Sequence, residues 1–406
     1  MDLVMLLNYG IAFFTLFVVN VFLLLYLRHK DDYQERPKSS GKQPIVSIVI
    51  PAYNEGPYIA DSLKTILAID YPADKLDIIV VDDGSTDDTF RIAKGFETEG
   101  STSGDRKRQS PSLRVFTKKN GGKGAALNFG IERARGEFVA TMDADSYVTP
   151  PVIKEILPLF DEKDVMAVTP SVKVKPSECW IKEFQRVEYL LILFSRKLLS
   201  FIDSVPVTPG PFSVFRKSVF AEIGGFDEDN LVEDQEIALR IQAANYRIKS
   251  SMTADVYTEP PDNMKDLLKQ RIRWQRGGFR NYWKYKYLIK PEYGDFGMYF
   301  VPLNFVTITA FFLMIGLMIN SILSTPYYSK YIWLETFGLN IGLFTFIGAF
   351  VFITSTIFLY LSVHAFEEEK IKLRYILAFM LFYWFLAVGY NTLFIYKEIR
   401  KEATSW

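Results

Sequence analysis

The stretch Met142-Asp143-Ala144-Asp145-Ser146 directly follows the apolar run Phe138-Val139-Ala140-Thr141. This run predicts a short buried strand, which places the two carboxylates just beyond its carboxyl end. In an open α/β sheet, ligands bind outside the carboxyl ends of the strands. Carboxylates suit hard cations such as Mg²⁺, which keep positions free for substrate phosphates. Asp-x-Asp also occurs in ordinary polar turns, so the rest of the chain has to decide between a turn and a site.

The composition limits the classes of protein to which this chain can belong. A chain of 406 residues predicts more than one domain. Lys+Arg and Asp+Glu both number 47, which argues against a general nucleic-acid binder, because such proteins carry a basic excess. The single cysteine, Cys179, excludes an internal disulfide. The two histidines, His29 and His364, both flank apolar segments, which excludes a His-based zinc site or a Ser-His-Asp triad in the soluble part.

Strands and helices are expected to alternate from residue 44 onward, which is typical of a doubly wound α/β fold. The run 46–50 predicts a first strand that stops at Pro51, and Ser85 or Thr86 is a suitable N-cap for a helix over 86–96. The region 100–112 is rich in Ser, Gly and charge and predicts a surface loop. The remaining expected elements are helices over 59–69, 123–134, 150–160 and 237–244 and strands over 76–81, 113–117, 138–143 and 165–170.

The N-terminal segment Leu3–Leu27 is uncharged and long enough to cross a hydrocarbon core of about 30 Å. Asp2 precedes it where a signal peptide would carry positive charge, and no Ala-x-Ala cleavage site follows, so we expect a membrane helix over 1–27. Arg28-His29-Lys30 comes next. By the positive-inside rule, this basic stretch places the following domain in the cytoplasm, after a polar linker that ends near residue 43.

Three further apolar segments cover about 298–323, 337–365 and 375–396, and their length again fits membrane-spanning helices. The basic residues of 370–374 suit a cytoplasmic loop. Four spans would leave the C-terminus outside, whereas the lysines and arginine of the polar tail, 397–406, favour the inside. Incomplete spanning by one segment would remove this conflict.

A broad apolar face runs along the expected helix 180–202, with Arg186, Arg196 and two lysines mostly on the other side. The pattern fits a core helix or a helix lying in the membrane interface. We favour the interface because the chain carries membrane anchors, and we expect such helices over about 178–202 and 263–289.

Three stretches join the aspartate pair at expected strand ends or helix starts. Tyr53 and Glu55 close the first strand, where an aromatic ring can stack on a base and a carboxylate can bond a nucleoside. Asp83 ends the second strand and can accept from a base N–H or a ribose hydroxyl. Lys123 opens a helix after two glycines, where it can meet a phosphate. The spacing is not that of a P-loop. Each stretch alone could be an ordinary polar turn, but together they predict a binding site for a nucleoside diphosphate.

Two later stretches suggest chemistry. Glu233 and Asp234 precede a helix, where acids cap favourably, but a carboxylate there can equally act as a general base toward a sugar hydroxyl. Gln270, Arg273 and Trp274 combine hydrogen-bond donors with an aromatic face that can stack on a sugar. A basic helix near a membrane can carry the same residues by chance.

With these motifs, the chain resembles the family 2 glycosyltransferases, which have the GT-A fold. It is most similar to the membrane-embedded processive members, such as hyaluronan, poly-N-acetylglucosamine, chitin-oligosaccharide and cellulose synthases. The resemblance runs from about Pro44 to Gly278. It implies a Rossmann-like mixed sheet with helices on both faces over 44–290, in addition to membrane-spanning helices over 298–396.

The resemblance also implies roles, which are carried over position by position. By analogy, Tyr53 and Asp83 contact uridine with Glu55 nearby, Lys123 lies on the donor side, and Asp143 and Asp145 bind the diphosphate and a Mg²⁺ or Mn²⁺ ion. Gly210-Pro211-Phe212 lines the acceptor site, and Asp234 beside Glu233 is the catalytic base. Gln270, Arg273 and Trp274 match the Gln-x-x-Arg-Trp motif, whose arginine meets the diphosphate and whose tryptophan floors the acceptor pocket.

We therefore expect a multi-pass plasma-membrane enzyme with a cytoplasmic catalytic domain. It would transfer a sugar from a nucleotide sugar, such as UDP-GlcNAc or UDP-Glc, to a growing polysaccharide, with inversion. Transfer to a lipid-linked polyprenyl phosphate is the nearest alternative, and a nucleotide-sensing transport or scaffold protein is another. Expected partners are the donor, the acceptor and the bilayer, but no nucleic acid, and homo-oligomer formation stays open.

Overall fold

The computed structural model describes residues 3–33, 41, 43–98, 111–324, 343–366, 368–400 and 402. Parts of the expected linker, of the loop after residue 98, of the apolar segment 337–365 and of the polar tail lie outside these residues. The chain divides into two compact units. One, here called the sheet unit, is made of Asp31–Leu288 and Lys370–Trp406, and the other, the helical unit, of Met1–Lys30 and Ile289–Glu369.

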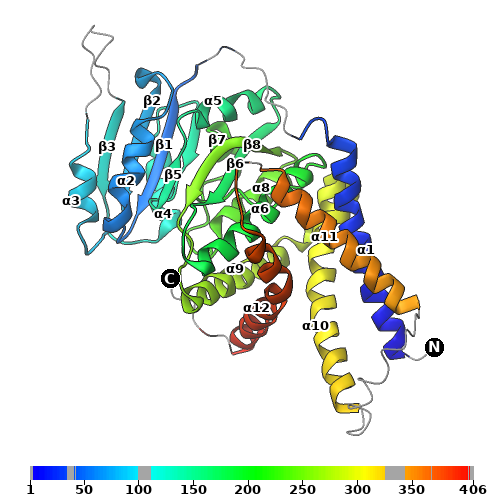
Figure 1. Ribbon diagram of the computed structural model, residues 1–406. Coiled ribbons are helices and arrows are strands. Elements are labelled where there is room, and N and C mark those ends of the chain that lie inside the picture. Colours follow the sequence, from blue (N-terminus) through cyan, green and yellow to red (C-terminus); the bar gives the residue numbers. More distant parts are fainter. Residues whose placement is uncertain are drawn as a thin grey trace. The chain divides into compact units, whose positions relative to one another are not determined.

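The described strands of the sheet unit form one mixed sheet of eight strands in the order β3-β2-β1-β4-β7-β6-β8-β5 (Figure 1). The first four in this order are parallel, β7 is antiparallel to both β4 and β6, and β5 is antiparallel to β8. The strands are β1 Val46–Ala52, β2 Leu76–Asp82, β3 Ser112–Thr117, β4 Phe138–Thr141, β5 Ser146–Val148, β6 Val165–Val174, β7 Ser213–Arg216 and β8 Arg247–Thr258.

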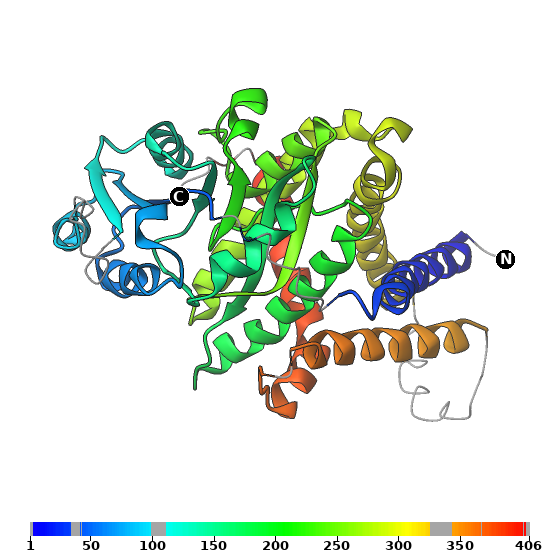
Figure 2. The same ribbon diagram turned by 90° about the horizontal axis from the view of Figure 1, so that it is seen from above.

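Helices cover both faces of this sheet because the central strands are apolar on both sides (Figures 1 and 2). Ile48 and Ile78 face a core shared with α2 and α5, whereas Val49 and Ile79 face a second core shared with α4 and α8. The alternation follows from the two-residue period of a strand. The helices of these two layers are α2 Gly56–Leu67, α3 Thr89–Lys94, α4 Lys123–Arg133, α5 Val152–Ile156, α7 Ser218–Ile223 and α8 Glu233–Ala243.

Several expected boundaries differ from the observed ones, among them the ends of β4 and β6 and the start of α8, and two further differences have a clear physical cause. Strand β1 does not stop at Pro51 but continues to Ala52, with Pro51 opposite Val81. The pairing of β1 with β4 ends at Val49, so the missing N–H of Pro51 costs no hydrogen bond to β4. Helix α3 starts at Thr89 rather than Thr86, since the backbone N–H of Thr89 donates to the Asp87 carboxylate (3.0 Å) and fixes the turn before the helix.

The long helix α6 (Trp180–Ser200) is buried on most of its surface, including its charged side. It packs against β6, β8 and α12 (Leu373–Ile399). Arg186 and Arg196, assigned by sequence to a polar face, are 5% and 7% exposed. The core alternative therefore describes this environment better than a membrane interface, which only exposed residues such as Trp180 can reach.

Helix α9 (Met264–Lys284) joins α6 and α12 through buried polar contacts. Arg271 Nη2 lies 2.5 Å from Glu188 Oε2 of α6, and both side chains are nearly inaccessible. The hydroxyl of Tyr383 on α12 donates to the other Glu188 oxygen (3.1 Å). At the far end of α12, Glu398 pairs with Arg276 and Arg280 of α9 at 3.1 and 2.8 Å. The last helix is therefore part of the sheet unit.

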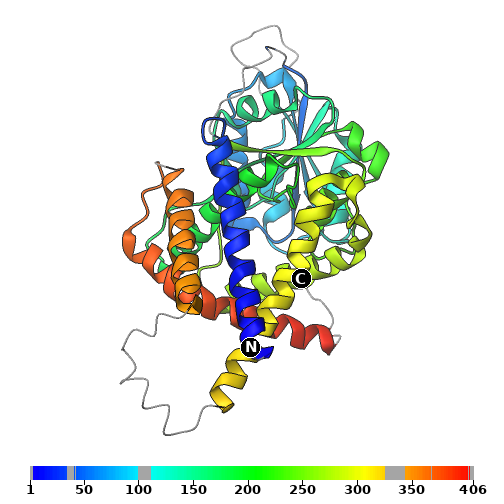
Figure 3. The same ribbon diagram turned by 90° about the vertical axis from the view of Figure 1, so that its right-hand side faces the viewer.

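The helical unit contains α1 (Leu3–His29), α10 (Val301–Ser324) and α11 (Leu343–His364). Helix α1 packs against the other two, with Phe22 beside Phe358 of α11 (Figure 3). Among the described residues, the helices long and apolar enough to cross a membrane are Leu3–His29, Phe296–Asn320, Phe346–His364 and Leu373–Ile399.

We predict that the Glu188→Ala substitution destabilises the sheet unit by about 3–5 kcal/mol, because it leaves the Arg271 guanidinium buried without its counter-charge. Thermal unfolding of the purified chain in detergent measures this loss. Asp61→Ala is the matched control, because it breaks a pair with Lys64 in which both side chains are mostly exposed, and it should barely change Tm. Equal Tm values for the two variants would contradict the prediction.

Candidate functional site

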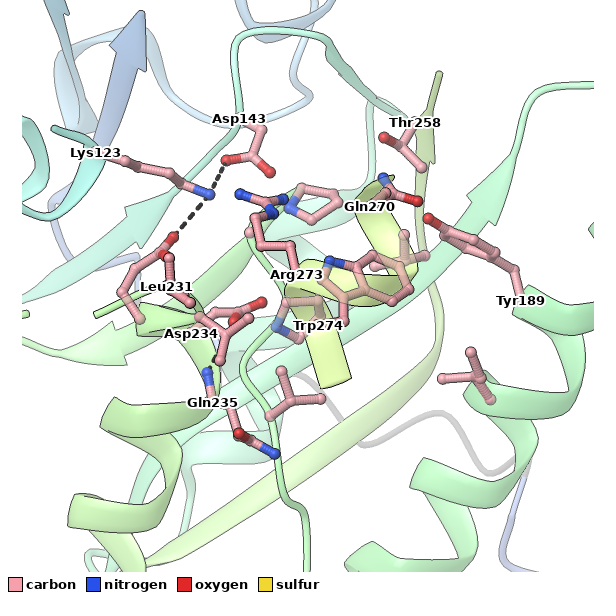
Figure 4. A pocket seen from close by; sticks show the side chains of 18 of the residues that line it. Lys123, Asp143, Tyr189, Leu231, Asp234, Gln235, Thr258, Gln270, Arg273 and Trp274 are labelled. Carbon is pink, nitrogen blue, oxygen red and sulfur yellow. Dashed lines mark hydrogen bonds and ion pairs between the residues drawn. The ribbon is translucent and has the colours of Figure 1, made fainter. Parts of the chain in front are cut away.

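A cavity of about 380 Å³ opens at the carboxyl ends of the central strands (Figure 4). Its walls come from the end of β4, the first turns of α4 and α8, the segment before β7, and one face each of α6 and α9. The residues that sequence reasoning selected and that line it are Lys123, Asp143, Asp145, Gly210, Pro211, Glu233, Asp234, Gln270, Arg273 and Trp274.

Lys123 connects two sides of this cavity. Its ammonium nitrogen lies 2.6 Å from Asp143 Oδ1 and 2.9 Å from Glu233 Oε1, which Figure 4 shows as two dashed contacts. Burial alone would lower the pKa of Lys123, but the charges of Asp143, Glu233 and Asp234 raise it above its ordinary value. The lysine is therefore a permanent cation. It ties the end of β4 to the start of α8.

The ion pair between Lys123 and Asp143 occupies the space that a side chain at residue 210 would need. A Cβ at this position would lie 2.4 Å from Asp143 Oδ2 and 2.7 Å from Lys123 Nζ, closer than the atoms can approach. The backbone N–H of Asp143 donates to the Gly210 carbonyl (3.0 Å), which holds the two segments together. Phe212, two residues on, is fully buried in the core, so only Gly210 and Pro211 of the expected acceptor loop reach the cavity.

Three carboxylates crowd the β4 end of the site. The pKa of Asp145 is raised to about 6, first by burial and then by the charge of Asp143. Burial raises the pKa of Glu55 to about 7, and Asp145 and Asp143 add to the effect. Like charges at close range disfavour ionisation of each other, and a bound cation would relieve that repulsion.

The donor atoms fit a divalent ion that takes part of its shell from a substrate. In the described part of the chain, no group of three or more His, Cys, Asp or Glu side chains is arranged to hold a metal by itself. Mg²⁺ is commonly bound through one or two carboxylates, with phosphate oxygens and water completing six positions. Asp143 and Asp145 supply the carboxylates of such a site.

Asp234 lies in the first turn of α8, directly after the Glu233 that Lys123 holds. Burial raises its pKa to about 6, the Glu233 charge adds to the rise, and Lys123 opposes it. The Asp234 carbonyl accepts from both the N–H and the hydroxyl of Thr208, which fixes the backbone. Its carboxylate is therefore held at the cavity wall and is ionised at neutral pH, as a general base requires.

The α9 wall separates two arginines that are two residues apart. Because residues i and i+2 of a helix point about 200° apart, Arg271 faces the core and Glu188, whereas Arg273 faces the cavity. Trp274 also lines the cavity, and the Arg271 guanidinium packs over its ring at 4.2 Å. The buried arginine thus supports the ring that the cavity presents.

Tyr53, Glu55 and Asp83 do not line this cavity. Tyr53 is 48% exposed at the end of β1, and Glu55 stays coupled to the site through its charge. Asp83 is buried, and its carboxylate accepts from the N–H groups of Gly121 and Gly122 and pairs with Lys118 at 2.7 Å. Asp83 therefore shapes the loop that leads into Lys123, and a nucleoside contact stays a prediction.

Sequence reasoning missed one wall of the cavity. Tyr189, Ile192 and Arg196 of α6 line it at spacings of three and four residues, which place them along one stripe of the helix. The signal was present, because an arginine on a largely apolar helix needs a polar neighbour. The cavity also includes Val172, Pro206, Val207, Pro209, Leu231, Val232, Gln235, Thr258 and Glu259.

Comparison with known proteins assigns the family. The family model described as "Glycosyl transferase family 2" matches residues 47–224, which contain β1 to β4 and both site aspartates. The model described as "Glycosyl transferase family group 2" matches residues 138–394, more than half of the chain. This chain belongs to the family 2 glycosyltransferases. It is therefore an enzyme, and its mixed sheet is the GT-A fold that the motifs predicted.

Two synthases are among its relatives in sequence. The poly-beta-1,6-N-acetyl-D-glucosamine synthase of Staphylococcus epidermidis is 28% identical over 244 residues, which are 59% of this chain and 56% of that synthase. The synthase of the same name from Staphylococcus aureus is 28% identical over 235 residues, 57% of this chain and 54% of its own. The chain thus spans about half the length of these relatives.

A solved structure resembles most of the chain. The mannosyltransferase PcManGT from Pyrobaculum calidifontis, in complex with GDP-Man and Mn²⁺, has a TM-score of 0.61. It is 21% identical, and the match covers 87% of this chain and 99% of that one. At this identity the likeness concerns the fold.

We predict that Asp145→Asn removes the metal dependence of nucleotide binding by the purified chain. Its carboxylate is one of the two that can share a cation with a diphosphate. Titration of UDP with and without Mg²⁺ or Mn²⁺, followed by calorimetry, measures the effect. Asp61→Asn on the exposed face of α2 is the control and should bind UDP like the wild type. An unchanged metal dependence in Asp145→Asn would count against the assignment.

Proposed function

We propose that this enzyme transfers a sugar from a nucleotide sugar to a hydroxyl of a growing polysaccharide, with inversion at the anomeric carbon. The observation that carries the proposal is that Asp234 lines the same 380 Å³ cavity as Asp143 and Asp145. A base for the acceptor and a diphosphate site are thus within reach of one substrate. A UDP-sugar such as UDP-GlcNAc is the expected donor, given the names of the staphylococcal relatives.

The donor diphosphate would lie between the β4 end and α9. Lys123 and Arg273 are cations on the cavity wall, and backbone N–H groups at the start of α4 favour anions. Mg²⁺ or Mn²⁺ held by Asp143 and Asp145, when bound, would supply positive charge toward the leaving diphosphate. Lys123 keeps its own charge near that leaving group, because its pKa is raised by the carboxylates beside it.

The acceptor would approach from the Trp274 side. The ring gives a flat apolar surface on which a sugar can stack, and Gln270 beside it offers an amide. Asp234 then takes the proton of the attacking hydroxyl as the oxygen bonds to the anomeric carbon and the bond to the diphosphate breaks. An ionised carboxylate near neutral pH, whose pKa lies close below the working pH, suits that step.

We predict that kcat/KM falls about tenfold per pH unit below about pH 6, since the protonated form of Asp234 cannot accept a proton. The pKa of this carboxyl is raised, so the active form is the one present above that pH. Asp234→Asn should bind UDP normally and lose transfer by about 10²-fold or more. UDP release from UDP-sugars, measured from pH 5 to pH 8, tests both statements.

The Asp234→Asn variant also tests which carboxyl group causes the loss of activity at low pH. Asp145 has a raised pKa in the same range, so its protonation can contribute to the fall. Any residual transfer by Asp234→Asn should lack the contribution of residue 234 and depend less steeply on pH. Full activity in Asp234→Asn would remove this residue from the role, and sizing of the product by mass would separate a polymer from a single lipid-soluble species.

We propose further that α1, α10 and α11 span the membrane and that α12 lies along its cytoplasmic surface with the sheet unit. Contacts of α12 with α6 and α9 run from Phe379, beside Phe184, to Glu398, beside Arg280. They extend over about 28 Å, roughly two thirds of the length of this 27-residue helix. A helix held in this way along a water-facing unit does not cross the hydrocarbon core, and its outward apolar side chains, such as Phe382 and Phe385, would meet lipid.

Three spans also remove the conflict over the C-terminal tail. With Met1 outside, an odd number of spans leaves residues 370–406 in the cytoplasm, where the positive-inside rule favours their basic residues. We predict that epitope tags at the two ends of the chain report opposite sides of sealed vesicles, with the C-terminal tag cytoplasmic. Protease protection of both tags on the same side would support four spans instead.

A further inference from the structure

The feature that the proposed function does not use is Arg196, in the cavity wall formed by α6. It lines the cavity on the same helical stripe as Tyr189 and Ile192. The residue is only 7% exposed. Its Nε and Nη1 atoms are inaccessible to water and have no hydrogen-bond partner in the part of the chain that the structure describes.

Three cations in or near the cavity wall, Lys123, Arg271 and Lys182, have carboxylate partners. Lys123 pairs with Asp143 and Glu233, and Arg271 pairs with Glu188. On α6 itself, Lys182 pairs with Glu259 at 2.8 Å. A buried charge without a partner is costly. We therefore expect a ligand to supply the partner that Arg196 lacks within the described chain.

Arg196 shares its stripe of α6 with Tyr189, whose side chain points toward Gln270 and Trp274 on the expected acceptor side of the cavity (Figure 4). Burial lowers the pKa of Arg196 to about 10, which leaves it protonated at neutral pH, and the charge of Asp234 opposes that fall. The α6 wall thus adds a cation to the part of the cavity where the acceptor would lie.

We propose that Arg196 binds an anionic group of the acceptor, a carboxylate or a phosphate, close to the hydroxyl that Asp234 deprotonates. A guanidinium makes charge-assisted hydrogen bonds with either oxyanion. The carboxylate would belong to a uronic acid, and the phosphate to a phosphorylated glycan or to a lipid-linked one. This inference rests on the proposed function, since it specifies the acceptor class for that site.

Direct binding to the full-length chain in detergent, with UDP saturating, tests the inference without requiring turnover. Three disaccharides serve as probes: one ending in glucuronic acid, one ending in glucose 6-phosphate and one ending in glucose. The wild type should bind at least one charged probe more tightly than the neutral probe. Arg196→Gln should weaken that charged probe by about 10- to 100-fold and leave the neutral probe and UDP within about twofold.

Two variants control for structure. Lys197→Gln removes the next cation of α6, which bonds the Ser250 carbonyl (3.2 Å) and does not line the cavity, and it should keep the charged-probe affinity. Arg196→Gln should also raise Tm of the ligand-free protein by about 2 to 4 °C, because it removes an unpaired buried charge. A merely structural arginine would give a lower Tm and no preference among the probes.

The outcomes separate this inference from the proposed function. Preference for the glucuronic acid probe identifies a uronate acceptor, and preference for the phosphate probe identifies a phosphorylated one. Equal binding of all probes by the wild type, or an equal loss of UDP affinity in Arg196→Gln, would overturn the inference. Arg196-dependent binding with no UDP release from any UDP-sugar would instead reject the proposed transfer and keep the anion site.

Discussion

The contacts of Lys123 with Asp143 and Glu233 organise the rest of the site. One ammonium group draws together the end of β4 and the start of α8, which lie far apart in the chain. Asp234 follows Glu233 directly, so this bridge also sets how far the expected base lies from the Asp143 and Asp145 pair. Gly210 leaves the space that the bridge occupies, and a side chain there would displace it. The geometry of the cavity thus depends on one cation and one missing Cβ.

The site is a crowded electrostatic environment, and its charges are unevenly compensated. Carboxylates from β4 and α8 share a small volume, and burial raises the pKa values of Asp145 and Asp234. Lys123 neutralises part of this charge, while Arg196 remains without a bonded partner in the described chain. Such imbalance is typical of sites whose ligands bring charge of their own. A family 2 glycosyltransferase must accept a diphosphate and activate an alcohol in the same cavity, and the uneven charges match these two tasks.

Much of this arrangement could be predicted from the sequence, because strand ends of a parallel sheet converge. The β-branched runs of β1 and β2 and the turn after β4 indicated where Asp143 and Lys123 would meet. The environment of α6 could not be predicted. Its charged side is covered by α9 and α12, and the Tyr383 hydroxyl reaches Glu188 across 195 residues of sequence. The spacing of apolar residues predicts the amphipathic faces of a single helix. Which face lines a cavity depends on packing partners that are distant in sequence. The hydrogen bonds of Asp83 with the backbone N–H groups of Gly121 and Gly122 could not be predicted either, because they depend on the path of a loop far along the chain.

The position of α12 after the helical unit in the sequence has a consequence for biogenesis. The sheet unit is nearly complete by Leu288, yet its last helix is synthesised only after the whole helical unit. Until then α6 and α9, which carry one wall of the cavity, lack the surface that covers Glu188 and Phe184. Domains usually fold as units while the ribosome is still adding residues, from the N-terminal end onward. The walls that α6 and α9 contribute to the cavity can therefore reach their final packing only after α12 has been synthesised, later than the apolar helices of the helical unit.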